Sequence, residues 1–180
     1  MARVSLITGG ARSGKSRYAL RLSSETEGAR AFVATCQAGD EEMQERIRRH
    51  RETRENTGWN TIEEPVELAS VLSAYPEYRL MLVDCLTLWI SNLMGRAEEA
   101  GMELTEEEIE RRCRALLTAC EGREGAVVFV TNEVGDGIVP ANPMARRYRD
   151  LVGRCNQTMA AGAADVTLVT CGIPMKLKEE

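Results

Sequence analysis

A chain of 180 residues is long enough for one domain with a sizeable hydrophobic core, and a second domain would be cramped. The formal net charge of −5 argues against a general nucleic-acid-binding protein, which would carry a basic face. No apolar run is long enough to cross a membrane, and the six cysteines lack the spacing of a metal site. We therefore expect a single domain over residues 1–180 in the cytoplasm, with reduced thiols and no nucleic-acid partner.

The first expected strand and helix flank a glycine-rich turn. RVSLIT (residues 3–8) is a short apolar run typical of a buried strand, and a helix is expected to begin near Lys15. Between them, GGARSGKS matches the pattern G-x-x-x-x-G-K-[ST] in full. In this context backbone N–H groups and the helix N-terminus cradle phosphates, while Lys15 reaches the β- and γ-phosphates and Ser16 binds Mg²⁺. The predicted nucleotide-binding residues are Gly9, Gly10, Ala11, Arg12, Ser13, Gly14, Lys15 and Ser16.

The only histidine lies in the densest cluster of arginines. After a strand at residues 30–35, a helix capped by Asp40 is expected to carry Arg46, His50 and Arg54 on one stripe. Neighbouring guanidinium groups lower the pKa of an imidazole, which keeps a ring nitrogen free to attack phosphorus. The arginines would meanwhile hold the phosphate oxygens. The alternative is a solvated basic helix face with an incidental histidine.

Two acidic residues follow at the ends of extended segments. GWNTIEEP (residues 58–65) is a short extended piece in which Glu63 could accept hydrogen bonds from a base or ribose, or cap the helix after Pro65. Asp84 ends the apolar strand RLMLVD (residues 79–84), where a carboxylate that holds the nucleotide's Mg²⁺ belongs. A strand-terminal Asp can instead cap the next helix, here an apolar one expected over residues 86–95. Residues 96–101 are expected to form a surface connection.

The last third of the chain continues the alternation of strands and helices. An acidic helix is expected over residues 105–120, a strongly β-branched strand over 125–132, a helix over 142–161 and a last strand over 165–170. Apolar strands separated by helices indicate an α/β fold with a mainly parallel central sheet and helices on both faces. Such sheets bind ligands at the carboxyl ends of their strands. Asn132 and Glu133 are expected to leave their strand toward the nucleotide.

Taken together, these motifs make the sequence similar to the bifunctional adenosylcobinamide kinase / adenosylcobinamide-phosphate guanylyltransferase family, nearly from end to end. TNEVGDGIVP and RIRRHR carry the most specific part of the likeness. The resemblance implies a RecA-like P-loop NTPase fold and a homo-oligomer, commonly a trimer. It also implies two reactions on a corrinoid. A nucleoside triphosphate first phosphorylates the hydroxyl of adenosylcobinamide, and GMP then passes from GTP through a guanylylated histidine to the phosphate, giving adenosylcobinamide-GDP.

Carried onto this sequence, the resemblance identifies His50 as the guanylylated histidine. His50, Lys15 and Asp84 are then the expected catalytic residues, Ser16 and Asp84 the Mg²⁺ ligands, and GTP or ATP the nucleotide. Beyond residues 9–16, the expected nucleotide contacts are Ala34, Thr35, Cys36, Arg51, Glu52, Thr53, Arg54, Glu63 and Asp84. Two other functions fit the P-loop: a simple small-molecule kinase with a structural histidine, and a RecA-like ATPase module. The first predicts no covalent nucleotide adduct, and the second predicts a basic face that the acidic total does not offer.

Overall fold

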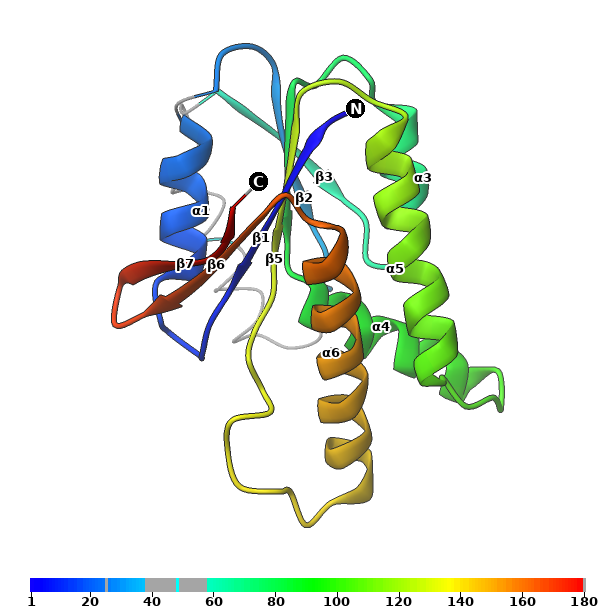
Figure 1. Ribbon diagram of the computed structural model, residues 1–180. Coiled ribbons are helices and arrows are strands. Elements are labelled where there is room, and N and C mark those ends of the chain that lie inside the picture. Colours follow the sequence, from blue (N-terminus) through cyan, green and yellow to red (C-terminus); the bar gives the residue numbers. More distant parts are fainter. Residues whose placement is uncertain (25, 38–47, 49–57, 180) are drawn as a thin grey trace.

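A computed structural model describes residues 1–24, 26–37, 48 and 58–179 (Figure 1). Seven strands are present in these ranges: β1 (Arg3–Thr8), β2 (Arg30–Ala34), β3 (Trp59–Glu63), β4 (Leu80–Asp84), β5 (Ala126–Val130), β6 (Asp165–Thr170) and β7 (Ile173–Glu179). The helices whose bounds fall in these ranges are α1 (Lys15–Ser24), α3 (Leu68–Ala74), α4 (Leu86–Glu99), α5 (Glu106–Glu121) and α6 (Pro143–Gly162). No helix in the described ranges is both long and apolar enough to span a membrane.

The strands form one sheet in the order β3-β2-β4-β5-β1-β6-β7. Neighbouring strands run parallel from β3 to β6, and only β7 is antiparallel to its neighbour. The predicted α/β class and mainly parallel sheet are therefore confirmed. One strand, β5, separates the strand that leads into the glycine-rich loop from the strand that ends at Asp84. The glycine-rich loop and Asp84 consequently lie at the same edge of the sheet, where the parallel strands have their carboxyl ends.

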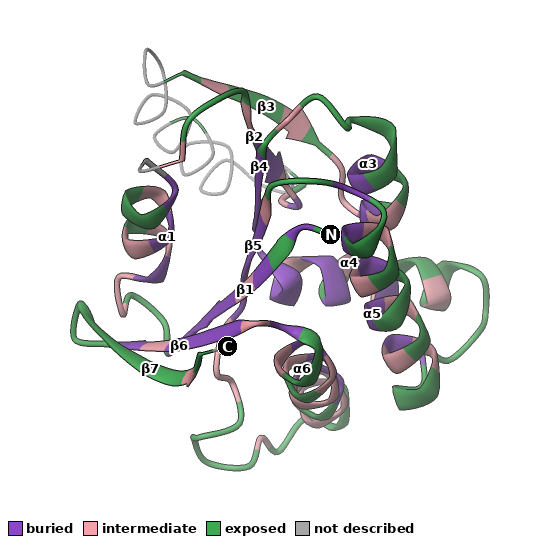
Figure 2. Ribbon diagram, turned by 45° about the horizontal axis from the view of Figure 1, so that its top comes forward, coloured by how far each residue is buried: buried purple, intermediate pink, exposed green. Residues whose placement is uncertain are grey.

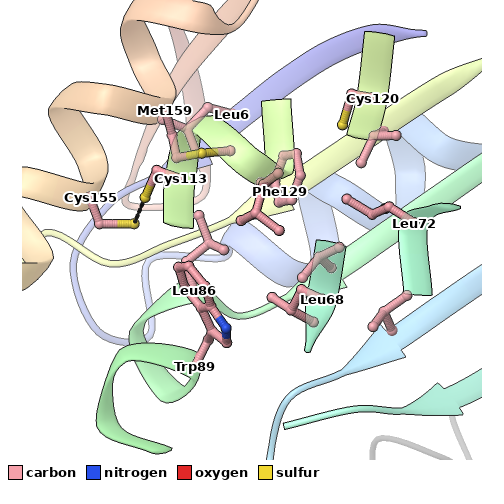
Figure 3. Close-up of a cluster of buried hydrophobic side chains, with 14 of the residues drawn as sticks. Leu6, Leu68, Leu72, Leu86, Trp89, Cys113, Cys120, Phe129, Cys155 and Met159 are labelled. Atoms are coloured by element: carbon pink, nitrogen blue, oxygen red, sulfur yellow. Dashed lines mark hydrogen bonds between the residues drawn. The ribbon is translucent and has the colours of Figure 1, made fainter. Parts of the chain in front are cut away.

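Helices cover both faces of the sheet, as predicted. Among the described helices, α1 lies on one face, while α3, α4, α5 and α6 lie on the other (Figures 1 and 2). The larger core fills the second face, and its fully buried side chains include Leu86, Trp89 and Phe129 (Figure 3). Burying side chains of this size contributes about 1.5–3 kcal/mol each. Within this core Cys113 of α5 and Cys155 of α6 are buried thiols whose sulfurs lie 3.5 Å apart.

Two helices begin at residues whose side chains cap them. The side chain of Thr105 accepts a hydrogen bond of 3.2 Å from the N–H of Glu108 at the start of α5. Asn142 accepts from the N–H groups of Met144 and Ala145 at the start of α6, where Pro143 occupies the first turn. Both caps satisfy N–H groups that have no partner within the helix. Together they fix the start of α5 and of α6.

The C-terminal part of the chain differs from prediction in one element. We expected the strand at 165–170 to be the last, but β7 follows it as an exposed edge strand (Figure 2). Pro174 lies near the start of β7, and an edge strand tolerates a proline because one of its sides needs no ladder hydrogen bonds. The irregularity at Val166 and Thr167 in its partner strand also breaks the regular pairing. The prediction that the pattern ends at β6 was wrong.

A second difference concerns the expected surface connection at residues 96–101. Helix α4 continues through this segment as far as Glu99. Ala97 still packs on the core, and Ala and Glu are good helix formers, so nothing in the segment stops the helix. The chain leaves the helix only at Ala100 and Gly101, the latter at φ +65. The connection is therefore shorter than predicted.

Candidate active site

The glycine-rich segment forms a turn between β1 and α1 that its glycines make possible. Gly9 has φ +146 and Gly14 has φ +98, values that favour glycine over residues with a Cβ. A Cβ on Gly9 would lie 2.3 Å from the carbonyl oxygen of Val169, so this position has no room for a side chain. The loop thus packs directly on the backbone of β6. This is the strand–loop–helix context that the phosphate-binding motif requires.

Lys15 is the best-buried charged residue of this loop. Its Nζ donates a 2.7 Å hydrogen bond to the carbonyl of Gly10, and the residue is only 8% exposed. Burial lowers the pKa of the Lys15 ammonium, whereas the nearby Asp84, Cys85 and Glu133 act in the opposite direction. The ammonium is therefore held by the phosphate loop and is acted on by the charge of two carboxylates. A buried amine in this position is suited to contacting the phosphates of a nucleotide.

The predicted residues on β3, β2 and β4 lie side by side. In the sheet register Ala34 is paired with Glu63 on one side and with Asp84 on the other. Asp84 is paired in turn with Val130 of β5, which is paired with Ile7 of β1. This row crosses the carboxyl edge of the sheet and ends one residue before Thr8 and the glycine-rich loop. Residues separated by up to about 120 positions in the chain are thus brought to one edge of the sheet.

The structure decides two of the capping alternatives. The N-cap of α4 is Cys85, so Asp84 does not occupy the capping position. Just before α3, the carboxylate of Glu64 accepts hydrogen bonds from the N–H groups of Val66 and Glu67, both at 2.8 Å. Glu63 does not make these hydrogen bonds. The capping readings of Asp84 and Glu63 were therefore wrong. Their roles at the nucleotide stay predictions.

Thr35 ties β2 to the start of α4 beneath this edge. It is fully buried, and its hydroxyl donates to the carbonyl of Cys85 and accepts from the Cys85 N–H, both at 2.8 Å. The carbonyl of Thr35 also accepts from the side chain of Asn92. Cys36, the next residue, is half-buried, and its sulfur lies 3.7 Å from the carbonyl oxygen of Gln37. The Thr35 side chain is thus engaged within the protein.

Comparison with known proteins agrees with this arrangement. Residues 5–177 match the family described as cobinamide kinase / cobinamide phosphate guanyltransferase. The chain belongs to this family. It is 43% identical to the bifunctional adenosylcobalamin biosynthesis protein CobP of Pseudomonas aeruginosa, over 97% of each chain. It is 39% identical to the bifunctional adenosylcobalamin biosynthesis proteins CobU of Escherichia coli and Salmonella typhimurium, in each case over 96% of this chain and 98% of the relative.

Membership of the cobinamide kinase / guanyltransferase family confirms the resemblance drawn from the motifs. It also confirms the predicted enzyme class, a kinase and guanylyltransferase of cobalamin biosynthesis. The simple kinase and the RecA-like ATPase module are disfavoured as readings of the whole chain, because the match extends over almost its full length.

Part of the predicted site lies outside the described residues. This applies to His50, Arg51, Glu52, Thr53 and Arg54, and also to Arg46 and the expected helix cap Asp40. The part of the predicted site that the structure describes consists of the phosphate loop, residues 34–36, Glu63 and Asp84. The placement of the predicted guanylylated histidine therefore stays a sequence-based prediction.

Sequence analysis missed the partners of Glu133. The hydroxyl of Thr8 donates to Glu133 Oε1 at 2.6 Å, and Asn156 Nδ2 donates to the same oxygen at 3.2 Å. The N–H of Glu133 donates to the carbonyl of Gly9 at 3.0 Å, and Asn156 also donates to the carbonyl of Asn132. Glu133 does lie beside the nucleotide loop, as expected. Thr8 and Asn156 carry no local signal, because their contacts join positions far apart in the sequence.

The residues predicted to hold Mg²⁺ suit that ion chemically. Ser16 and Asp84, both half-buried, offer a hydroxyl and a carboxylate, the hard oxygen donors that Mg²⁺ prefers. In addition, the hydroxyl of Ser13 is buried in the loop with no hydrogen-bond partner in the described residues. An unpartnered polar atom in this place is consistent with a loop that is completed by a polar ligand.

Proposed function

We propose that this chain phosphorylates adenosylcobinamide with a nucleoside triphosphate and then transfers GMP from GTP to the product through a covalent adduct on His50. The single observation that carries the proposal is the buried Lys15, held within the phosphate loop and acted on by the charge of Asp84. A loop of this form, in a chain that matches a family of cobinamide kinases and guanyltransferases, supports phosphoryl and nucleotidyl transfer at one edge of the sheet.

In the proposed site, backbone N–H groups of residues 9–16 and the N-terminus of α1 bind the phosphates. Arg12 and Ser13 extend this cradle, and Ala34, Cys36 and Glu63 line the nucleotide from the neighbouring strands. Ser16 and Asp84 would hold Mg²⁺, which would neutralise charge on the phosphate oxygens. The nucleotide is GTP, with ATP or GTP serving the kinase step.

The transferase step follows from the chemistry of residues 45–54. An imidazole among guanidinium groups stays uncharged, and its ring nitrogen attacks the α-phosphorus of GTP with loss of pyrophosphate. Arg51 and Arg54 neutralise the phosphate oxygens as the bond forms, while Glu52 and Thr53 contact the nucleotide beside them. The phosphate of adenosylcobinamide phosphate then attacks the same phosphorus and releases the imidazole.

We further propose that residues 1–180 form a single domain, which works in the cytoplasm as a homo-oligomer of three subunits. Its partner is a corrinoid small molecule, and no nucleic acid takes part. The acidic total charge supports the absence of a nucleic-acid partner, and the names of the relatives support a corrinoid substrate.

The deciding experiment is the intact mass of the protein after exposure to GTP and Mg²⁺. We expect an increment equal to one GMP, acid-labile and alkali-stable, on the peptide that contains His50. The variant His50→Ala should lose both the increment and guanylyl transfer while keeping kinase activity. Lys15→Ala is the matched variant, since it should weaken both steps. Absence of any adduct in the wild-type protein would favour a simple kinase with a structural histidine.

A further inference from the structure

The two hydrogen bonds that the carboxylate of Glu133 accepts both go to one of its two oxygens. Thr8 and Asn156 both donate to its Oε1 atom, at 2.6 and 3.2 Å. In the part of the chain that the structure describes, no hydrogen bond or ion pair reaches Oε2. A carboxylate oxygen has room for about two hydrogen bonds, so the two donors fix the orientation of the side chain and leave the second oxygen available.

The position of Glu133 is set by the phosphate loop itself. Its N–H donates to the carbonyl of Gly9, the first residue of that loop, at 3.0 Å. Its negative charge acts on the ammonium of Lys15, as does that of Asp84. Two carboxylates, one at the end of β4 and one shortly after β5, are therefore close enough for their charge to act on the ammonium that is proposed to contact the transferred phosphate. Since Asp84 is assigned to Mg²⁺ in the proposed function, Glu133 is the carboxylate without a role.

We propose that Glu133 is the general base of the kinase step. This inference rests on the proposed function and adds a catalytic residue to it. As the hydroxyl oxygen of adenosylcobinamide bonds to the γ-phosphorus, its proton passes to Oε2 of Glu133. The bond between the γ-phosphorus and its bridging oxygen breaks, and the nucleoside diphosphate leaves with the electron pair. The proton is then lost to solvent.

The two reactions of the proposed site differ in their need for such a base. An alcohol must lose a proton to become a phosphate ester, so a positioned base accelerates its attack. The nucleophiles of guanylyl transfer are a neutral imidazole nitrogen and the oxygen of an ionised phosphate monoester. In each case the attacking atom itself carries no proton, so no base is needed to remove a proton from it. Glu133 should therefore serve the first reaction and not the second.

The test is the variant Glu133→Gln, in which the side-chain carbonyl still accepts from Thr8 and Asn156. Kinase turnover with ATP and adenosylcobinamide should fall about 10²- to 10⁴-fold, the usual contribution of a general base. Transfer of GMP from GTP to adenosylcobinamide phosphate, measured on the same preparation, should stay near the wild-type rate. Asp136→Asn is the matched control, because this exposed carboxylate lies in the same loop, and both of its rates should be unchanged.

An equal fall in both reactions at an unchanged unfolding midpoint would overturn the proposal and make Glu133 a structural residue. An unchanged kinase rate would overturn it as well. If the Gln variant does not fold, Glu133→Ala is assayed with added formate, which should restore kinase turnover only. Lack of restoration in a folded Ala variant would count against the base. Failure of the proposed function would look different, because the wild-type protein itself would then lack one of the two reactions.

Discussion

The amide N–H of Gly172 donates a 2.8 Å hydrogen bond to the carbonyl of Ser13, which joins the turn between β6 and β7 to the phosphate loop. The two segments also touch, since a Cβ on Gly14 would lie 3.3 Å from the Cα of Gly172. Cys171 and Gly172 form this turn at φ +54 and φ +80. The turn between the last two strands thus contacts the phosphate loop directly.

The substitution Gly172→Ala tests this support. At φ +80 a residue with a Cβ is strained, at a cost of about 1–2 kcal/mol. The new methyl group would also lie 3.3 Å from Nη2 of Arg17, which has to move. We expect a lower free energy of unfolding in urea and weaker nucleotide binding by equilibrium titration. Both follow because the turn that contacts Ser13 is displaced.

The matched control for this substitution is Gly137→Ala. Gly137 lies in the loop before α6, its φ is not in the left-handed region, and a Cβ there would meet no atom within 4 Å. The control should unfold and bind nucleotide as the wild-type protein does. If Gly172→Ala behaved in the same way as the control, the turn would not be supporting the phosphate loop.

The sequence predicted the elements whose signals are local. Strands β1 and β6 have the predicted bounds, because each is an apolar run ended by a glycine-rich or polar segment. The start of α1 at Lys15 follows from the motif, and the helices expected from residues 105 and 142 begin with those residues as their N-caps. The phosphate loop and the edge position of Asp84 were predictable for the same reason.

What sequence reasoning missed depends on distant partners. The pair Thr8–Glu133 spans 125 positions and the pair Asn156–Glu133 spans 23, so no local pattern marks either one. Strand β7 was missed because its exposed residues and Pro174 resemble a loop until the neighbouring strand is known. The contact between Gly172 and Ser13 depends on that strand in turn. These features depend on pairing between distant parts of the chain, which the periodicity of the sequence does not reveal.

The glycines of the phosphate loop are not equivalent, and a pair of variants should separate them. In Gly9→Ala the methyl group would lie 2.3 Å from the carbonyl oxygen of Val169, and φ +146 is already unfavourable. We expect a loss of about 2–4 kcal/mol in the free energy of unfolding. In Gly10→Ala the methyl group meets nothing within 4 Å, so the change should stay within about 0.5 kcal/mol.

Urea denaturation of the nucleotide-free protein measures both variants. If both variants lost the same free energy of unfolding, the packing of Gly9 on β6 would not be the reason why the loop needs glycine at this position. Nucleotide binding by Gly10→Ala gives a second result from the same samples. Because its fold should be intact, any weakening of binding must come from the methyl group near the phosphates.

The ion pair between Arg3 and Asp165 should make the free energy of unfolding depend on pH in the acid range. Arg3 donates to both carboxylate oxygens of Asp165, at 2.6 and 2.8 Å, and Ser5 donates to one of them at 3.2 Å. The hydrogen bond from Arg3 is the main cause that lowers the pKa of Asp165 below its ordinary value of 3.8, while burial opposes it. Since the pKa is lower in the folded chain, protonation is more costly there than in the unfolded chain.

The contribution of this pair should be complete at neutral pH and down to about pH 5, and should disappear as the pH falls through the lowered pKa. Because Arg3 is about half exposed, we expect it to be about 1 kcal/mol. Asp165→Asn should therefore be less stable than the wild-type protein at pH 7, and the difference should shrink in acid. Urea denaturation across this range measures it, with Asp150→Asn on the exposed face of α6 as the control. A difference that stayed constant with pH would show that Asp165 stabilises the fold through packing and not through its charge.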